Sequence, residues 1–406
     1  MWVKMASPQS KTHTWLLLLL LCITGALLLG HHVLMEPSCG ESASSDSSSS
    51  SSLRVMVVAD PHFAGPRTAW VDRVRRESFM RSVFQRAHRR LNPDALVVLG
   101  DVSDAGRKSN DAQWSAVLAR FWDMVRPFSA VPIQVVVGNH DVGDHHDPGF
   151  SSRLPRFAAS FPGLDDTCGS RFTWSGVDFV SLNAMALHGD GCSVCARVEK
   201  YVESVSSALK THRKESNPEQ EIKGHNIGGG DGGASTGPVL LLHLPLYRAD
   251  DSACTPIDLP RCAPWHDLEG SCLKVGSAPP LVLPQEELHR VGQDVLSYKS
   301  STQVLQSFRP RLVLSGHTHR WCDRVHADGT REVTVPSMSW RNRDDPSFAF
   351  LTFHANSSFT IHRCMLAHES TVIMLYVLWG CTILSWLLAS SFILVSRLRS
   401  KSVKPE

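Results

Sequence analysis

The chain has 406 residues, a formal net charge of +2 and 11 cysteines. This length allows one large domain or two small ones. A protein that binds nucleic acid usually carries a strongly basic face, and the near-neutral balance gives no sign of one. Nucleic acid is therefore excluded from the expected partners.

Two long apolar segments lie near the ends of the chain. Residues 15–35 contain no Asp, Glu, Lys or Arg, and we expect a transmembrane signal-anchor there. Because the strictly apolar part of this segment is short, a cleaved signal peptide is the alternative. Residues 370–396 are also uncharged and are long enough to span a bilayer with some tilt. The sequence therefore predicts a transmembrane helix at each end of the chain.

Basic residues outside these segments predict their orientation. Lys4 and Lys11 precede the first segment, and the second is followed by Arg397, Arg399, Lys401 and Lys404. Since Lys and Arg are enriched on the cytoplasmic side of spans, residues 1–14 and the basic tail, 397–406, are expected in the cytosol. Everything between the two spans would then lie in a lumen or outside the cell.

Cysteine usage agrees with a luminal domain. Nine of the 11 cysteines lie between the apolar segments, which predicts disulfides and one unpaired thiol in an oxidising compartment. In "CSVC", residues 192–195, we favour a disulfide over a zinc site or a redox dithiol, because no second CxxC accompanies it. The sequon at Asn356 predicts a glycan, with an unused sequon as the alternative.

Between the spans, a Ser-rich luminal linker at residues 36–52 leads to a single domain at residues 53–369. Short β-branched apolar runs predict strands, and longer amphipathic stretches predict helices. The expected strands cover 53–59, 95–100, 133–138, 238–247, 311–316, 331–337 and 347–353, with a hairpin at 171–184. The expected helices cover 71–90, 112–125, 195–212 and 284–307, and we expect a flexible loop at 226–237 and a disulfide-stapled insertion at 250–282. This alternation predicts an α/β fold.

Polar side chains stand at or near the carboxyl ends of five of these apolar runs, where α/β folds build their sites. In chain order they are Asp60 and His62, Asp101 and Asp104, Asn139 with His140 and Asp141, the in-strand His243, and His317 with His319. Carboxylate, imidazole and amide groups suit Mn, Fe or Zn. Seven of these residues are candidate metal ligands, which is too many for one tetrahedral ion. We therefore expect two divalent ions that share Asp101, because a pair of metal ions can bind a phosphate between them.

The ordered motifs D-x-H, G-D-x-x-D, G-N-H-D, a lone His and G-H-x-H, spread over residues 55–319, resemble those of the calcineurin-like metallophosphoesterases. The resemblance implies a four-layer αββα sandwich around a two-metal phosphoester hydrolase. By position, one metal would be held by Asp60, His62, Asp101 and His319, and the other by Asp101, Asn139, His243 and His317. His140 would protonate the leaving oxygen or stabilise charge on the phosphate. Asp104 would orient His140, with a simple loop cap as its alternative.

Three further stretches, "LHGDGCSVC", "HLPLYR" and "PSMSWRNRDDPSF", together with the two apolar ends, are similar to one branch, the post-GPI-attachment metallophosphoesterases. That branch implies Mn-dependent removal of an ethanolamine-phosphate side branch from a mannose of the GPI glycan, which helps GPI-anchored proteins leave the endoplasmic reticulum. Fe and Zn are the alternative metals. The substrates would be GPI-anchored proteins, and cargo receptors are a further expected contact.

The same resemblance implies a multi-pass membrane protein of the early secretory pathway, at endoplasmic reticulum exit sites, the ER-Golgi intermediate compartment and the Golgi. The tail "KSVKPE" departs from the dilysine retrieval signal of the branch, because Ser402 stands where a basic residue is expected. Two other functions stay open: a general luminal phosphoesterase acting on nucleotides or lipid head groups, and an inactive fold used as a cargo receptor.

Several residues near the motifs are candidate substrate contacts. Arg341 and Arg343 could bind a substrate phosphate, because guanidinium pairs well with phosphate oxygens. Their alternative role is a salt bridge to Asp344 or Asp345. Tyr247 and Arg248 could likewise contact the substrate or have a purely structural role. Trp321 could stack on a sugar or simply pack inside the domain.

Overall fold

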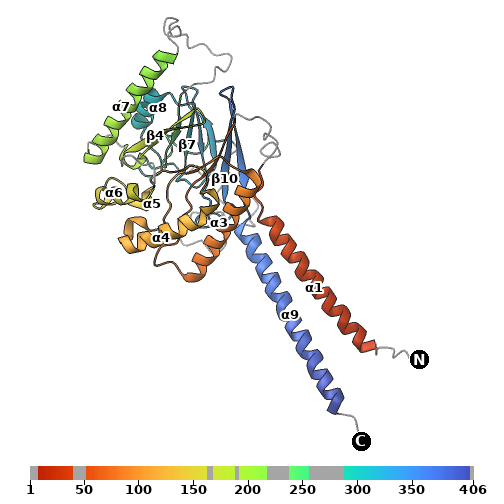
Figure 1. Ribbon diagram of the computed structural model, residues 1–406. Helices are drawn as coiled ribbons and strands as arrows, with labels where there is room; N and C mark the ends of the chain where they lie inside the picture. The colour runs from red at the N-terminus through yellow and green to blue at the C-terminus, as the bar shows by residue number, and fades with distance from the viewer. Residues whose placement is uncertain are drawn as a thin grey trace. The chain divides into compact units, whose positions relative to one another are not determined.

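A computed structural model describes residues 8–39, 52–161, 168–187, 192–216, 237–255 and 288–402. They form two compact units (Figure 1). One unit contains the helices α1 (Pro8–Leu34) and α9 (Glu369–Ser402), and the other runs from Pro37 to Met365. Most of the predicted Ser-rich linker, the Gly-rich loop up to residue 236 and residues 256–287 of the predicted insertion lie outside the described residues.

Of the described residues, one helix is long and apolar enough to cross a membrane, the Glu369–Ser396 part of α9. The apolar part of α1, Leu18–Leu34, is shorter, so the signal-anchor remains a prediction. α1 and α9 contact each other, and the ring centroids of His31 and Tyr376 lie 5.7 Å apart.

The first sheet has five strands in the order β11-β10-β1-β2-β3. They are β1 (Leu53–Val58), β2 (Ala95–Val98), β3 (Ile133–Val135), β10 (Ser347–Phe353) and β11 (Phe359–Met365). β1, β2 and β3 run parallel, whereas β10 is antiparallel to β1 and to β11. The carboxyl ends of the three parallel strands therefore meet at one edge of this sheet.

The second sheet has six strands in the order β4-β5-β6-β7-β9-β8. They are β4 (Gly169–Trp174), β5 (Val177–Leu182), β6 (Val239–Leu241), β7 (Leu312–Ser315), β8 (Cys322–Val325) and β9 (Arg331–Thr334). β5, β6, β7 and β9 are parallel, and an antiparallel strand closes each end.

The core lies between the two sheets. Alternate residues of β1, Val55 and Val57, share one buried cluster with Val239 and Leu312 of the second sheet. Met56, on the opposite face of β1, is also completely buried. Strands buried on both faces read as continuous apolar runs in the sequence, which is why these strands are predicted with nearly correct bounds.

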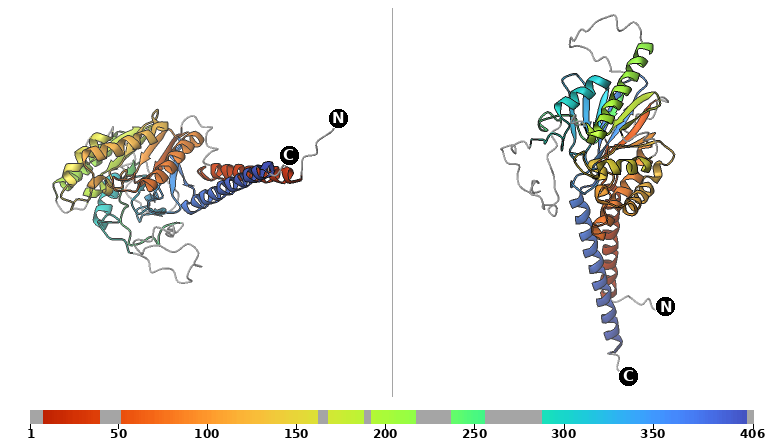
Figure 2. Two further views of the ribbon diagram at one scale, coloured as in Figure 1. Left: turned by 90° about the horizontal axis from the view of Figure 1, so that it is seen from below. Right: turned by 90° about the vertical axis from the view of Figure 1, so that its left-hand side faces the viewer.

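Helices cover the sheets, with α3 and α4 on one side and the neighbouring α7 and α8 on another (Figures 1 and 2). The longer ones are α3 (Trp70–Leu91), α4 (Asp111–Met124), α6 (Phe150–Ser160), α7 (Ser193–Ser216) and α8 (Tyr298–Phe308). Single-turn helices lie at Gly106–Lys108, Arg126–Phe128, Asn139–Val142 (α5) and Ala184–Ala186. The result is a mixed α/β fold with two sheets, as predicted.

Some predicted elements are wrong in their bounds. α8 begins at Tyr298, because residues 288–297 form a turn around Gly292, whose φ is +80°. His243 lies two residues beyond β6 and not inside a strand, and Pro245 follows it. β8, β11, α5 and α6 were not predicted. Six of the seven β11 residues are only partly buried, so this strand lacks a clear apolar pattern.

Three disulfides join described cysteines: Cys39–Cys364, Cys192–Cys195 and Cys254–Cys322. The prediction of a disulfide in the CSVC segment is therefore confirmed. Cys262 and Cys272 lie outside the described residues. Asn356 is exposed in the turn between β10 and β11, where its side chain accepts a hydrogen bond from the Ser358 backbone N–H.

Candidate metal centre

Three groups of potential metal ligands lie where the parallel strands of both sheets end, and two of them consist of predicted ligands. The third, His62 with Asp104 and His140, shares His62 with the first. The first group is Asp60, His62 and His319, and within it one ligand atom from each residue lies within 4.8 Å of the others. The second group, Asp101, His243 and His317, meets the same condition. The residues of these first two groups come from loops that follow β1, β2, β6 and β7. The structure therefore brings together side chains that lie up to 259 positions apart in the sequence.

In the first group, nitrogen and oxygen atoms converge on one point. His62 Nε2 lies 3.3 Å from His319 Nε2 and 3.9 Å from Asp60 Oδ1. The distance from His319 Nε2 to Asp60 Oδ1 is 3.6 Å. The other oxygen of Asp60, Oδ2, accepts a hydrogen bond of 2.9 Å from the His317 backbone N–H.

In the second group, Asn139 contributes the central oxygen. Asn139 Oδ1 lies 3.0 Å from His243 Nε2 and 3.1 Å from His317 Nδ1. Asp101 lies between the two groups, because Oδ1 is 3.5 Å from His243 Nε2 and Oδ2 is 3.7 Å from His62 Nε2. Its carboxylate is the one in the described site that faces both groups, which is the position expected of a bridge.

Two of these carboxylate oxygens indicate that cations belong here. Asp60 Oδ1 and Asp101 Oδ2 are buried and have no hydrogen-bond partner. A buried carboxylate oxygen without a partner is costly unless a cation neutralises it. Imidazole, carboxylate and amide donors are those that borderline divalent ions prefer. The residues present therefore fit two divalent cations, and the choice among Mn, Fe and Zn stays a prediction.

A further cluster, Asp251 with Cys254 and Cys322, also has metal-ligand spacing. Its two sulfur atoms are joined in a disulfide, so neither is a thiolate that can bind a metal. We therefore do not count this cluster as a metal site.

The backbone at the site is strained. The residues Asp60, His62, Asp101, His317 and His319 all have φ between +48° and +71°. A residue with a side chain pays about 1–2 kcal/mol for this left-handed conformation, and such strain concentrates at functional sites. Close packing adds to the constraint, since a Cβ on Gly138 would collide with the Asp101 backbone N and Oδ1. The glycines of the motifs therefore allow the loops to approach one another.

Backbone carbonyls fix the protonation of two ligand histidines. His243 Nδ1 lies 2.7 Å from the Leu99 carbonyl, and His317 Nε2 lies 2.8 Å from the Gln293 carbonyl. Because a carbonyl oxygen only accepts hydrogen bonds, each of these ring nitrogens carries a hydrogen and donates a hydrogen bond to the carbonyl. The second nitrogen of each ring, His243 Nε2 and His317 Nδ1, then presents its lone pair to the site.

Burial and neighbouring charges shift the pKa values at the site. Burial lowers the pKa of His62 well below its ordinary value, and burial with the nearby His243 lowers the pKa of His317 to about 4. Burial alone raises the pKa of Asp101, but His243 and His140 hold it well below its ordinary value. Burial opposes protonation of His243, yet Asp101 raises its pKa to about 9. A metal ion therefore competes with a proton for His243.

His140 lies beside the first group. Its backbone N–H donates to Asp101 Oδ1 at 2.7 Å, and its ring meets that of His62 edge-on with centroids 4.9 Å apart. His140 Nδ1 donates to the backbone carbonyl of Asp104 at 2.9 Å. Asp104 thus contacts His140 through a hydrogen bond to its main-chain carbonyl, and a carboxylate oxygen of Asp104 lies within 4.8 Å of a His140 ring nitrogen.

The Asp104 carboxylate binds Arg341, whose Nε donates to both oxygens at 3.1 and 3.2 Å. The side chain of Arg341 is 42% exposed, so part of its guanidinium remains available to a ligand. Arg343 differs, because it is buried and its Nε and Nη2 both donate to Asp345 at 2.9 Å. The alternative salt bridge predicted for Arg343 is therefore present, to Asp345, and a substrate contact at Arg343 stays a prediction.

Three residues at the site were not predicted to act there. Asn342 Nδ2 lies 3.0 Å from His319 Nε2, and Arg76 donates to the His62 carbonyl at 3.2 Å. Asp141, in the GNHD motif, accepts hydrogen bonds from the backbone N–H groups of Ser103 and Gly138. Of the three, only Asp141 carried a sequence signal, because it stands inside a motif.

The sequence of this chain matches one family of known proteins. A sequence profile described as calcineurin-like phosphoesterase matches residues 53–321. Metallophosphoesterase 1 of Cricetulus griseus is 36% identical over 326 residues, which cover 80% of this chain and 75% of that protein. Metallophosphoesterase 1 of Mus musculus is 37% identical over 330 residues, covering 80% and 74%. A solved dimetal phosphatase from Danio rerio aligns with a TM-score of 0.41 at 14% identity, over 78% of this chain and 99% of that one.

Proposed function

Because this chain belongs to the calcineurin-like phosphoesterase family, and is thus a phosphoester hydrolase, we propose that it removes an ethanolamine-phosphate side branch from a mannose of the GPI glycan. The observation that carries hydrolysis is the Asp101 carboxylate, which faces both ligand groups and leaves Oδ2 buried without a partner. Support for the substrate comes from the stretches "LHGDGCSVC", "HLPLYR" and "PSMSWRNRDDPSF". Support also comes from the 36% identity to Metallophosphoesterase 1 proteins.

Two divalent ions, when bound, supply Lewis-acid stabilisation of the phosphoryl oxygens and a water of lowered pKa. The expected metal is Mn, with Fe and Zn as alternatives. Asp60, His62, Asp101 and His319 would hold one ion, and the other would be held by Asp101, Asn139, His243 and His317. Both ions would thereby share Asp101.

His140 supplies the proton in this proposal. During hydrolysis the oxygen of water bonds to phosphorus, the bond from phosphorus to the mannose oxygen breaks, and that oxygen needs a proton to leave as a hydroxyl. His140 Nδ1 is engaged by the Asp104 carbonyl, so the proton comes from Nε2 of the protonated ring. The hydrogen bond from the His140 backbone to Asp101 keeps this ring next to the bridging carboxylate.

Arg341 is the proposed phosphate contact. Its Nε is held by Asp104 and its Nη1 donates to Asn342 Oδ1 at 3.3 Å, which leaves Nη2 of a guanidinium whose side chain is 42% exposed. A guanidinium oriented in this way suits the non-bridging oxygens of a phosphodiester.

A membrane-bound substrate fits the rest of the chain. α9 contains a 28-residue apolar stretch suitable as an anchor, and three disulfides agree with an oxidising compartment. We therefore propose a multi-pass membrane protein of the early secretory pathway, with a luminal catalytic domain, that acts on GPI-anchored proteins and contacts cargo receptors.

The proposal is tested in cells that lack the protein by measuring how fast a GPI-anchored reporter reaches the cell surface. Wild-type protein should restore normal export, whereas Asp101→Ala should not, because it removes the residue shared by both ligand groups. A reporter with a transmembrane anchor serves as the control cargo. If Asp101→Ala restores export as well as the wild type does, hydrolysis is not the function.

A further inference from the structure

The loop that carries two of the ligand histidines needs outside support. We define the histidine loop as residues 316–320, between the end of β7 at Ser315 and the start of β8 at Cys322. His317 and His319 have φ of +71° and +58°. Since residues with side chains avoid this conformation, contacts from other parts of the chain must hold the loop in place.

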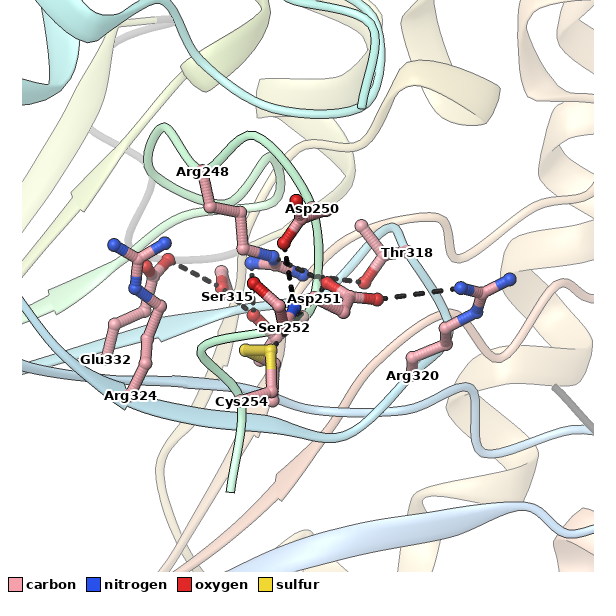
Figure 3. Close-up of a disulfide and its surroundings, with 12 residues drawn as sticks. Arg248, Asp250, Asp251, Ser252, Cys254, Ser315, Thr318, Arg320, Arg324 and Glu332 are labelled. Atoms are coloured by element: carbon pink, nitrogen blue, oxygen red, sulfur yellow. Dashed lines mark hydrogen bonds and ion pairs between the residues drawn. A yellow bond between two sulfur atoms is a disulfide. The ribbon is translucent and has the colours of Figure 1, made fainter. Parts of the chain in front are cut away.

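Arg248 provides the central contact (Figure 3). It follows β6 in the sequence and is only 3% exposed. Its Nη2 donates to Thr318 Oγ1 at 3.4 Å, and Thr318 is the residue between the two histidines. Its Nη1 donates to Thr334 Oγ1 at 3.1 Å. Thr334 in turn lies 3.0 Å from the Ser315 hydroxyl, so Arg248 contacts the middle of the loop directly and its base through one neighbour.

Asp251 fixes Arg248 and also contacts the far side of the loop. Its Oδ1 accepts from Arg248 Nε at 2.8 Å and lies 2.9 Å from His289 Nε2. Its Oδ2 lies 3.6 Å from Arg320 Nη1, and Arg320 directly follows His319. Burial alone raises the pKa of Asp251, but His289 and Arg248 hold it well below its ordinary value, so this carboxylate is charged at neutral pH. Asp251 thus links Arg248, His289 and Arg320 around the loop.

The Cys254–Cys322 disulfide closes this arrangement. Cys254 lies three residues after Asp251, and Cys322 lies two residues after Arg320. Beside the disulfide, the Thr255 backbone N–H donates to the Asp323 carbonyl at 2.9 Å. The segment that carries Arg248 and Asp251 is therefore covalently joined to the strand that follows the histidine loop.

We propose that Arg248 is a positioning residue of the metal centre, which holds His317 and His319 in ligand geometry through Thr318, with Asp251 and the Cys254–Cys322 disulfide fixing Arg248. This inference rests on the metal-dependent hydrolase function and not on the identity of the substrate. Direct binding of substrate phosphate by Arg248 does not fit, because the side chain is buried and its Nε, Nη1 and Nη2 all have acceptors within the chain.

The first test replaces Arg248 with Lys in the full-length protein in detergent. Lys keeps the positive charge but cannot donate hydrogen bonds to Asp251, Thr334 and Thr318 at the same time. Residues that orient metal ligands typically change metal affinity by 10- to 100-fold, so we expect Arg248→Lys to raise the Kd for Mn²⁺ by about 10-fold or more. Electron paramagnetic resonance of free Mn²⁺ during titration measures this Kd. Thr318→Val, which removes one hydroxyl, should raise it by a smaller factor.

Arg331→Lys is the matched control. Arg331 also pairs with an aspartate through Nε and Nη2, at 2.9 and 2.7 Å from Asp323, but this pair joins β8 to β9 and does not contact the histidine loop. We expect wild-type Mn²⁺ affinity in this variant, even where its thermal unfolding temperature falls as far as that of Arg248→Lys. Such a result separates loop positioning from a general loss of stability.

The disulfide has its own matched pair of variants. Cys254→Ser with Cys322→Ser should weaken Mn²⁺ binding in the same direction as Arg248→Lys. Cys39→Ser with Cys364→Ser removes a disulfide at β11 and should leave Mn²⁺ affinity unchanged. Equal Mn²⁺ affinities in the two double variants would remove the disulfide from the proposal.

Two outcomes would overturn the inference, and only the second would also overturn the metal-dependent function. If Arg248→Lys and Thr318→Val bind Mn²⁺ as the wild type does and hydrolyse bis(p-nitrophenyl) phosphate with wild-type kcat and KM, Arg248 does not position the site. If the wild-type protein itself binds no Mn²⁺, Fe²⁺ or Zn²⁺, the metal-dependent function fails together with the inference. Neither measurement depends on the GPI glycan.

Discussion

Individual side chains at this site are held mainly by backbone groups. Carbonyls of Leu99, Gln293 and Asp104 each accept a hydrogen bond from one histidine ring nitrogen and thereby leave the other ring nitrogen of that histidine for chemistry. A carbonyl does not titrate, so this orientation persists at any pH at which the domain stays folded. The histidines of the site therefore have two different roles. Four of them face the other ligands, whereas His140 lies beside the ligands and is the proposed proton donor.

The variant His140→Gln tests whether His140 donates a proton without binding a metal ion. Gln cannot deliver a proton to a leaving oxygen, so kcat for a phosphodiester should fall by about 10²- to 10⁴-fold. Because His140 is not counted among the ligands, Mn²⁺ affinity should stay near the wild-type value. Steady-state kinetics and Mn²⁺ titration check the two parts, with His146→Gln, an exposed histidine four residues after the end of α5, as a control. Loss of Mn²⁺ binding equal to the loss of rate would instead make His140 a ligand.

The motifs predicted the residues that converge at the site, because the carboxyl ends of parallel strands lie at one edge of each sheet. Contacts between distant segments were not predictable. The sequence shows that Arg341 and Arg343 are both cations, but only the fold decides that one meets Asp104 and the other Asp345. The contact between Asn342 and His319 likewise depends on the path of the loop that follows β9, which the sequence does not show.

Secondary-structure elements were predicted well where both of their faces are buried. β1, β2 and β7 are continuous apolar runs with every or almost every residue buried, and their predicted positions are correct. β8 and β11 lie at sheet edges, where exposure on one side weakens the pattern. α8 was predicted too long, because the preceding turn has helix-forming residues but is held by contacts such as Gln293 to His317.

The connection between β3 and α5 should tolerate no side chain at Gly138. A Cβ there would lie 3.0 Å from Asp101 Cα and closer still to two other atoms of that residue. Since the neighbour is largely backbone, Gly138→Ala should lower the free energy of unfolding by about 3 kcal/mol. It should also abolish Mn²⁺ binding by moving Asp101.

Gly329→Ala is the control for this variant. Gly329 has φ of +85°, but a Cβ there has no neighbour within 4 Å. The expected cost is about 1 kcal/mol from backbone strain alone, with Mn²⁺ binding intact. Chemical denaturation and Mn²⁺ titration compare the two variants. Equal behaviour of the two would contradict the close approach at Asp101.

The molecule as a whole combines a disulfide-bonded domain with a long apolar helix at its carboxyl end. Both features agree with a domain on the non-cytosolic side of a membrane, and Asn356 reports on that topology because it is exposed in the turn between two strands. We expect protein from cells to shift to lower apparent mass after endoglycosidase treatment. The shift should disappear in Asn356→Gln. A wild-type protein that runs at the unglycosylated mass without treatment would contradict the glycan predicted at Asn356.

The central claim is that this phosphoester hydrolase acts on the GPI glycan, and mass spectrometry of GPI glycans measures it directly. Glycans from cells that lack the protein should keep an ethanolamine phosphate on a mannose that wild-type cells have lost. Re-expressed wild-type protein should remove it, and Asp101→Ala protein should not. An ethanolamine-phosphate count that is the same with and without the protein would contradict the account and favour a different phosphoester substrate in the same compartment.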